Sequence, residues 1–340
     1  MENQMIVSAS PHIKSSLTTK RIMLDVLIAL APATIAGIIF FGWKAALVLA
    51  ISVLTAFVTE VVYSLAMKKP IKHILADFDY TSLITGLLLG LCLSSNAPWY
   101  LPMLGSMFAV AVVKMLFGGT GKNIVNPAIA GRIFLFLSFG RLMTSGWATP
   151  FLSGSAQSLG GLEGNLTAGA TQLSQILQLG NANGMNNLDL FLGIGVAGCI
   201  GETCKLALLI GGIYLVIRRV IDWKWPVLYI LSCGLMSAIL YKSFDMFLPS
   251  ILSGGLFLGA IFMATDYTTT PNTTWGNVIY FVLLGILTAS LRKATKLEVV
   301  SFVILLMNLV VPLINTYVRH KPFGYIKAKK EKKVKEEKAV

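Results

Sequence analysis

Apolar segments of roughly 20 residues recur along most of this 340-residue chain, and their recurrence restricts what the chain can fold into. Hydrophobic residues make up 55% of the sequence and charged residues only 13%, whereas a soluble domain carries about 25% charged residues. With a mean hydropathy of +0.75, the chain cannot hide its apolar surface in one core, so much of that surface must face lipid. The sequence therefore predicts an all-α polytopic membrane protein.

Ten stretches are expected to cross the membrane. Their predicted limits are 23–42, 45–67, 81–95, 99–117, 126–143, 188–217, 225–242, 247–264, 275–291 and 297–318. The sixth of these is taken as one long or broken span. The alternative is two spans at 188–217, which would move the loop of Arg292 inside but Arg218 and Arg219 outside. This pattern predicts a five-helix repeat at 1–143, a loop at 144–187, a second five-helix repeat at 188–320 and a charged tail at 321–340.

Two of the spans begin alike. Residues 82–86 read Ser-Leu-Ile-Thr-Gly, and residues 250–254 read Ser-Ile-Leu-Ser-Gly. Because these are spans 3 and 8, they run in opposite directions, as an inverted five-plus-five repeat requires. The alternative is a chance match, since small and apolar residues are common in membrane helices.

The basic residues predict the orientation of the chain. The net charge is +13, but Lys and Arg gather at the ends of apolar segments and in the tail, which is typical of topology determinants and not of a nucleic-acid groove. Most of these clusters fall inside if both termini are cytoplasmic, and the loop at 144–187 is then extracytoplasmic. One loop disagrees, because it places Arg292, Lys293 and Lys296 outside.

Charged and polar residues inside or next to the spans are candidates for function. Glu202 and Lys205 lie in an apolar stretch, where charges are costly and usually functional. They are three residues apart, so pairing on one helix face and a role in a site both remain open. Asp266 follows span 8 among several hydroxyl side chains, either as part of a polar cap or as part of a ring of groups for a ligand or cation.

A glycine-rich loop at 118–127 precedes the fifth span. Asn126 is expected to cap that helix and Pro127 to occupy its first turn. The free N–H groups of a helix start suit a phosphate or a ring carbonyl. The loop is not a Walker motif, because no Ser or Thr follows Lys122. Four cysteines and three histidines show no metal-ligand spacing, so no metal site is expected.

Six motifs, in order and spread over nearly the whole chain, resemble a known family. They are Ser10-Pro-His-Ile-Lys14, Asp79-Tyr-Thr-Ser-Leu-Ile-Thr-Gly86, Lys122-Asn-Ile-Val-Asn-Pro-Ala128, Gly201-Glu-Thr203, Arg218-Arg-Val-Ile-Asp-Trp-Lys-Trp-Pro226 and Met263-Ala-Thr-Asp266. In them the chain resembles the D subunits of Rnf complexes, which are ion-translocating ferredoxin:NAD+ oxidoreductases of the prokaryotic cytoplasmic (inner) membrane. It is similarly related to the B subunits of sodium-pumping NADH:quinone oxidoreductases.

The resemblance implies a fold like that of urea transporters and two flavins. One is an FMN joined through its phosphate to a threonine, which makes the chain a covalent flavoprotein and a phosphoprotein. The segment Thr167-Ala-Gly-Ala-Thr-Gln-Leu173 matches the family's attachment pattern, so Thr171 is the expected acceptor. The other flavin is expected to be a non-covalent riboflavin. The candidate cofactor-binding residues are Gly169, Ala170, Asn123, Asn126, Arg132, Thr265 and Asp266.

The implied function is a one-electron relay between the two flavins that drives Na+ or H+ outward. Glu60, Glu202 and Asp266 are the candidate acids for ion passage. The implied partners are the other Rnf subunits (A, B, C, E and G), a flavin transferase and membrane lipid. No Rossmann fingerprint or cysteine-rich motif occurs, so the NAD+ and ferredoxin sites are expected on those other subunits. The rival hypotheses are a solute channel or transporter of the same fold, and an anchor subunit without a cofactor.

Overall fold

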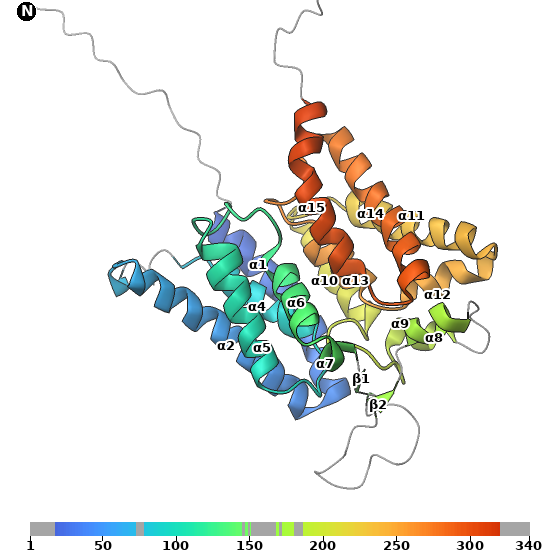
Figure 1. Ribbon diagram of the computed structural model, residues 1–340, viewed down its shortest axis with the longest axis horizontal. Helices are drawn as coiled ribbons and strands as arrows, with labels where there is room; N and C mark the ends of the chain where they lie inside the picture. The colour runs from blue at the N-terminus through green and yellow to red at the C-terminus, as the bar shows by residue number, and fades with distance from the viewer. Residues whose placement is uncertain are drawn as a thin grey trace, which may run out of the picture.

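A computed structural model describes residues 18–72, 78–144, 147–148, 150, 168–169, 172–179 and 186–319. The described chain is predominantly helical (Figure 1). The helices of its first part are α1 (Thr19–Phe41), α2 (Trp43–Ala66), α4 (Thr81–Leu91), α5 (Tyr100–Phe108) with the π-helix η1 (Ala109–Met115), α6 (Pro127–Ser138) and α7 (Gly140–Thr144).

A short antiparallel pair and two short helices follow. They are β1 (Trp147–Ala148), β2 (Ala168–Gly169), α8 (Gln172–Leu179) and α9 (Asn187–Leu192). The last part contains α10 (Lys205–Ile217), α11 (Lys224–Tyr241), the 3-10 helix η2 (Phe244–Met246), α12 (Phe247–Leu252), α13 (Leu256–Leu258), the π-helix η3 (Gly259–Met263), α14 (Thr274–Thr295) and α15 (Val300–Tyr317).

Several of these helices are long and apolar enough to cross a membrane. Within the described residues there are five, α1, α2, α11, α14 and α15, and six if the bent pair at 244–263 forms one span. Four further apolar helices are shorter, at 81–91, 100–115, 127–138 and 205–217. The protein is therefore a multi-pass membrane protein, and ten crossings remain a prediction.

Glycines interrupt two of the expected spans. Gly254, with φ +71°, separates α12 from α13, and the two arms of this pair bend by 68°. Gly193 and Gly195 also have positive φ, so the expected span at 188–217 is broken and α10 begins only at Lys205. Positive φ is accessible to glycine without a steric penalty, which explains why the breaks fall there.

The non-helical backbone between α9 and α10 is buried and hydrogen-bonded to the last residue of α4 and to the segment that follows it. Ile200 N donates to Leu93 O at 3.0 Å, and Gly201 N donates to Leu91 O at 2.8 Å. Irregular backbone at membrane depth is tolerated when protein groups satisfy it in this way. Backbone hydrogen bonds therefore join the end of α4 to the segment between α9 and α10.

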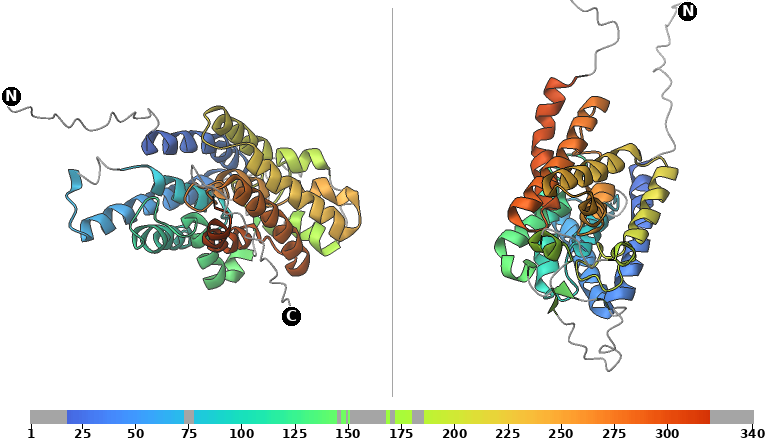
Figure 2. Two further views of the ribbon diagram at one scale, coloured as in Figure 1. Left: turned by 90° about the horizontal axis from the view of Figure 1, so that it is seen from above. Right: turned by 90° about the vertical axis from the view of Figure 1, so that its right-hand side faces the viewer.

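The first part (blue to green) and the last part (yellow to red) lie beside each other, as Figures 1 and 2 show. Helix α1 packs on α10, and α6 packs on α15, so both contacts join the two parts. Small residues permit these close approaches. A Cβ on Gly211 in α10 would collide with the carbonyl oxygen of Ala29 in α1, which is the close backbone packing typical of membrane helices.

The two ends of the helical bundle differ. The start of α1 and the end of α15 lie at one end, whereas β1, β2, α8 and α9 lie at the opposite end (Figure 1). Exposed aromatic side chains occur near both ends, as in membrane-interface belts. They are Trp43 and Trp99 near one end, and Trp223, Trp275 and Tyr317 near the other.

In the basic loop that disagreed with the predicted orientation, two basic side chains have protein partners. Arg292 is 1% exposed and forms a 2.9 Å ion pair with Glu298. Lys293 donates to the carbonyl oxygen of Leu240 and lies over the ring of Tyr241. Two of the three basic side chains are therefore held by protein groups, and the orientation of the chain remains a prediction.

Candidate functional site

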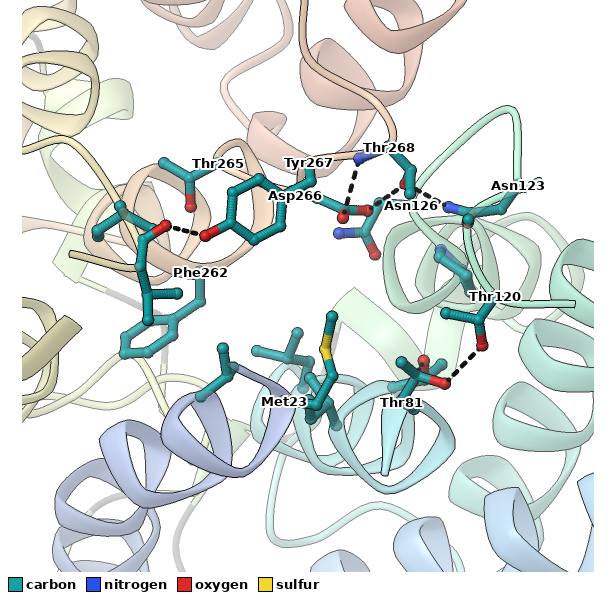
Figure 3. A pocket seen from close by; sticks show the side chains of 18 of the residues that line it. Met23, Thr81, Thr120, Asn123, Asn126, Phe262, Thr265, Asp266, Tyr267 and Thr268 are labelled. Carbon is teal, nitrogen blue, oxygen red and sulfur yellow. Dashed lines mark hydrogen bonds between the residues drawn. The ribbon is translucent and has the colours of Figure 1, made fainter. Parts of the chain in front are cut away.

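A pocket opens at the end of the bundle where α1 begins, between the first and last parts of the chain (Figure 3). Its empty volume is about 820 Å³, which includes space that is open to solvent. Its walls are mainly apolar and come from α1, α4, α10 and η3, with polar groups along one side. They include Met23, Val26, Ile84, Leu88, Leu215, Ile261 and Phe262 as apolar residues, and Thr81, Lys114, Asn123, Asn126, Thr265, Asp266 and Thr268 as polar ones.

Asn126 holds this side of the pocket together. Its side-chain oxygen accepts from Ala128 N at 3.0 Å and Ile129 N at 3.5 Å, and Pro127 occupies the first position of α6. The expected helix cap is therefore confirmed. The side-chain nitrogen of Asn126 donates to Met263 O at 3.2 Å, which ties the start of α6 to the end of η3.

Asn123 is placed differently, and its side-chain oxygen remains free to accept a hydrogen bond. Its side-chain nitrogen donates to Val125 O and to the hydroxyl of Thr268, both at 3.0 Å. Among the described residues no donor reaches its side-chain oxygen, so Asn123 can accept a hydrogen bond from a ligand. Three glycines with positive φ, Gly118, Gly119 and Gly121, form the loop that carries it.

Asp266 lies beside Asn123 and Asn126 (Figure 3). It accepts from Thr268 N at 3.4 Å and from the Thr268 hydroxyl at 3.0 Å. Desolvation raises the pKa of Asp266 above its ordinary value, although the hydrogen bonds from Thr268 act in the opposite direction. Next to it, Tyr267 donates its hydroxyl to Val220 O and closes one side of the pocket.

A buried lysine connects the pocket to two carboxylates. Lys114, in η1, lines the pocket and is 3% exposed. Its Nζ lies 2.9 Å from Glu60 Oε1 and 3.9 Å from Asp79 Oδ1. It also donates to the hydroxyls of Thr81 at 2.5 Å and Ser82 at 2.9 Å. Glu60 itself does not line the pocket, so Lys114 stands between them.

Arg132 and Glu202 belong to a second buried group away from this pocket. Arg132 donates to the hydroxyl of Ser301 at 2.9 Å and contacts the sulfur of Cys199 at 3.9 Å. Glu202 accepts from Cys199 N at 2.9 Å. Because α10 begins at Lys205, Glu202 and Lys205 share no helix face, and pairing on such a face is wrong. The Nζ of Lys205 is buried without a hydrogen-bond partner among the described residues.

The described parts of the attachment segment predicted for the covalent flavin, in β2 and α8, lie near the opposite end of the bundle (Figure 1). Gly169 is in β2, opposite Trp147, while Ala170 and Thr171 fall outside the described residues. In α8, Leu173 lies against Gly254, next to the Arg292–Glu298 ion pair. The structure thus brings Asn123, Asn126, Thr265 and Asp266 together in one pocket, and places Gly169 and Arg132 elsewhere.

The charged partners of these sites are residues that sequence reasoning misses. Lys114 reads as a topology determinant, and no motif singles out Asp79 or Glu298 for their charge. Glu60 and Lys114 are oppositely charged and lie in different apolar spans. Since such charges within a membrane usually pair, this is the signal that could have predicted their ion pair.

Comparisons with known proteins agree with the expected resemblance. The sequence model of the NQR2, RnfD, RnfE family matches residues 6–324. The chain is 41% identical over 336 residues to the D subunit of the Na(+)-translocating ferredoxin:NAD(+) oxidoreductase complex of Acetobacterium woodii, covering 98% of this chain and 99% of that protein. It is 34% identical over 334 residues to the D subunit of the proton-translocating ferredoxin:NAD(+) oxidoreductase complex of Clostridium ljungdahlii, covering 95% and 97%.

A third relative is the D subunit of the ion-translocating oxidoreductase complex of Stutzerimonas stutzeri, which is 34% identical over 328 residues, covering 89% of this chain and 92% of that protein. The match extends along nearly the whole length of each relative, so it includes the segments on both sides of the pocket. This chain therefore belongs to the NQR2, RnfD, RnfE family.

Proposed function

We propose that this chain is the D subunit of an ion-translocating ferredoxin:NAD+ oxidoreductase and relays electrons between a covalent FMN and a non-covalent riboflavin. The observation that carries the proposal is the pocket, which joins apolar walls to Asn123 and Asp266 in a chain that the family model matches over residues 6–324. The other Rnf subunits (A, B, C, E and G) supply the ferredoxin and NAD+ sites, and a flavin transferase attaches the FMN.

The residues of the pocket fit a flavin ring. Apolar side chains such as Ile84 and Phe262 offer surfaces for its faces, and Thr265 and Thr268 line its polar side. The free oxygen of Asn123 accepts from a ring N–H, while Asn126 acts indirectly by holding α6 against η3. When bound, the flavin supplies one-electron chemistry. The protein's contribution is to orient the ring and exclude water from its faces.

The covalent FMN is assigned to Thr171, which in the chain falls between β2 and α8. The neighbouring residues Gly169 and Ala170 leave little side-chain bulk where the phosphate and the transferase must approach. Two flavins at opposite ends of one bundle would carry electrons across most of the membrane. In the proposed orientation both termini are cytoplasmic, the pocket faces the cytoplasm and the attachment loop is extracytoplasmic.

Ion passage is assigned to Glu60, Glu202 and Asp266, which lie at different positions along the bundle. Two of the relatives are named for different ions, sodium in one and protons in the other. Family membership is therefore compatible with either ion for this chain.

An inverted repeat is part of the proposal, with ten spans and a fold like that of urea transporters. Its support is a pair of contacts at related positions. The hydroxyl of Ser82, in span 3, accepts from the buried cation Lys114 of span 4. The backbone carbonyl oxygen of Ser250, in span 8, accepts at 3.0 Å from the buried cation Arg292, which directly follows span 9.

Flavin fluorescence tests the covalent assignment. The denatured subunit from its native host should give a fluorescent band in a gel, and Thr171→Ala should remove the band because the phosphoester oxygen is lost. Thr167→Ala, in the same loop, is the matched control and should stay fluorescent. A dark wild-type band would contradict the redox function and favour the channel or anchor hypothesis.

Extraction of non-covalent flavin tests the pocket. Asn123→Leu removes the free acceptor and both donated hydrogen bonds, so riboflavin released by denaturing the complex should fall at least tenfold per subunit. Covalent FMN should be unchanged. Asn187→Leu, on the exposed surface of α9, is the control. Normal riboflavin in the Asn123 variant would exclude this pocket as its site.

A further inference from the structure

The oxygen atoms around Lys114 form a compact cage. They are the carboxylates of Glu60 and Asp79 and the hydroxyls of Thr81 and Ser82, at 2.5–3.9 Å from Nζ. These groups come from α2, from the loop before α4 and from the first turn of α4. Carboxylate and hydroxyl oxygens are also the ligands that hard metal cations prefer. The cage therefore suits any small monovalent cation, and the ammonium is the cation already inside it.

The charges in the cage do not balance. Glu60 and Asp79 supply two negative charges and Lys114 supplies one positive charge. The side chains of Glu60 and Asp79 are largely buried, at 13% and 18% exposed, so solvent compensates their negative charges only in part. A buried charge without a partner is costly. The site consequently retains affinity for positive charge even with the ammonium in place.

Lys114 belongs to both the pocket and the cage. It is the only one of the charged groups Glu60, Asp79 and Lys114 that lines the pocket. It is carried by η1, and a π-helical turn inside an α-helix frequently marks a functional position. A flexible four-carbon stem lets the ammonium turn between neighbouring acceptors without moving the backbone. Negative charge in the pocket and the carboxylate of Glu60 thus compete for one ammonium.

We propose that the cage of Glu60, Asp79, Thr81 and Ser82 is an exchangeable site for a Na+-sized cation, in which Lys114 is the resident cation. An electron arriving on the ring in the pocket adds one negative charge there and draws the ammonium toward the pocket. Na+ then replaces the ammonium beside Glu60, so one electron is balanced by one cation. The exchange half of the proposal stands alone, and the electron-driven half rests on the proposed function.

The coupling is reciprocal. If negative charge in the pocket raises the affinity of the cage for Na+, then Na+ in the cage raises the reduction potential of the ring by the same free energy. A purely structural ion pair would not make the reduction potential of the ring depend on Na+. The proposal therefore predicts changes in both cation binding and flavin potential.

Cation binding is measured first, in the oxidised purified complex, with radioactive Na+ in choline buffer. Lys114→Met vacates the cage, so this variant should bind one more Na+ per complex than wild type. Adding Glu60→Gln should weaken that extra site at least tenfold. Ser82→Ala keeps the ammonium and should show no extra site. Equal Na+ binding in wild type and Lys114→Met, or an extra site that survives Glu60→Gln, would overturn the proposal.

The potential of the non-covalent flavin is measured next, and its wild-type and Glu60→Gln measurements do not depend on Lys114→Met assembling. In Glu60→Gln the ammonium is released toward the pocket, so the potential should rise, while in Lys114→Met it should fall. In wild type the potential should rise with Na+ and not with choline. Shifts of the same sign in both variants, or a wild-type potential that depends only on pH, would overturn the coupling.

These two measurements separate the proposal from the proposed function. If no riboflavin is present, the flavin function fails, but the extra Na+ site in Lys114→Met still decides whether the cage exchanges cations. If riboflavin is present and the extra site is absent, the flavin function stands and the cage proposal is wrong.

Discussion

At the residue scale, the most constrained side chains are buried ionisable groups with specific partners. Asp25 shows the pattern in its simplest form. It is 4% exposed, and it accepts from Tyr214 at 3.0 Å and pairs with Arg218 at 3.1 Å. The pair joins α1 to α10 at the end where α1 begins. Removing one partner of such a pair leaves an uncompensated charge, which costs more than the pair contributes.

Asp79 makes stability depend on pH in a definite direction. Burial alone would raise its pKa, but the charge of Lys114 and hydrogen bonds from Thr120 and Thr81 outweigh burial, so the pKa of Asp79 lies below its ordinary value. A lowered pKa stabilises the folded state above the unfolded value, and the contribution is lost as pH falls through the folded value.

Asp79→Asn should therefore lower the melting temperature of the detergent-purified complex near pH 7. The difference from wild type should shrink as pH falls below about 4, the ordinary value for Asp. Asp245→Asn, at an exposed position in η2, is the control without a buried partner. A difference that stays constant from pH 7 to pH 3 would contradict the assignment.

At the element scale, glycines allow the broken helices to form. Gly254 adopts φ +71°, and its missing side chain leaves room for Glu298, Leu173 and Arg292. The break turns the backbone by 68° and exposes backbone groups, one of which, Gly255 N, donates to Glu298 at 3.4 Å. The ion pair and the break consequently depend on each other.

Gly254→Ala should destabilise the protein by about 2–5 kcal/mol, because it combines a strained left-handed conformation with overpacking. The measurement is the midpoint of unfolding in detergent, followed by subunit retention in the complex. Gly140→Ala is the matched control, since nothing lies within 4 Å of its added Cβ. Equal effects of the two substitutions would show that the break tolerates a side chain.

At the scale of the whole molecule, two ends with different contents define the protein. One end has the pocket, the start of α1 and the end of α15, and the other has β1, β2, α8 and α9. Two exposed residues mark these ends. Lys69 follows the end of α2, and Asn187 begins α9 at the opposite end. The arrangement therefore predicts that they face opposite sides of the membrane.

Single cysteines at these two positions test the arrangement. Cys204 is the one partly exposed native cysteine of the four, so Cys204→Ser serves as the background and should remain unlabelled. In right-side-out vesicles an impermeant maleimide should label Asn187→Cys, and Lys69→Cys should react only after inversion. Labelling of both from one side would contradict the two-ended arrangement.

The sequence by itself determined the membrane class, the family and the local signals. Long apolar stretches require lipid, Asn126-Pro127 starts a helix, and glycines mark the breaks, because each of these effects acts within a few neighbouring residues. The resemblance also selected Asn123, Asn126, Thr265 and Asp266, which the structure brings into one pocket.

Only the tertiary structure decided which distant residues meet. Glu60 and Lys114 are 54 positions apart, and Arg132 and Ser301 are 169 apart. Opposite charges in two apolar spans indicate that Glu60 and Lys114 could pair, but composition and spacing do not specify which helices pack together. For the same physical reason Arg132 lies away from the pocket, whereas Lys114, which local sequence presents as a topology determinant, lies between the pocket and Glu60.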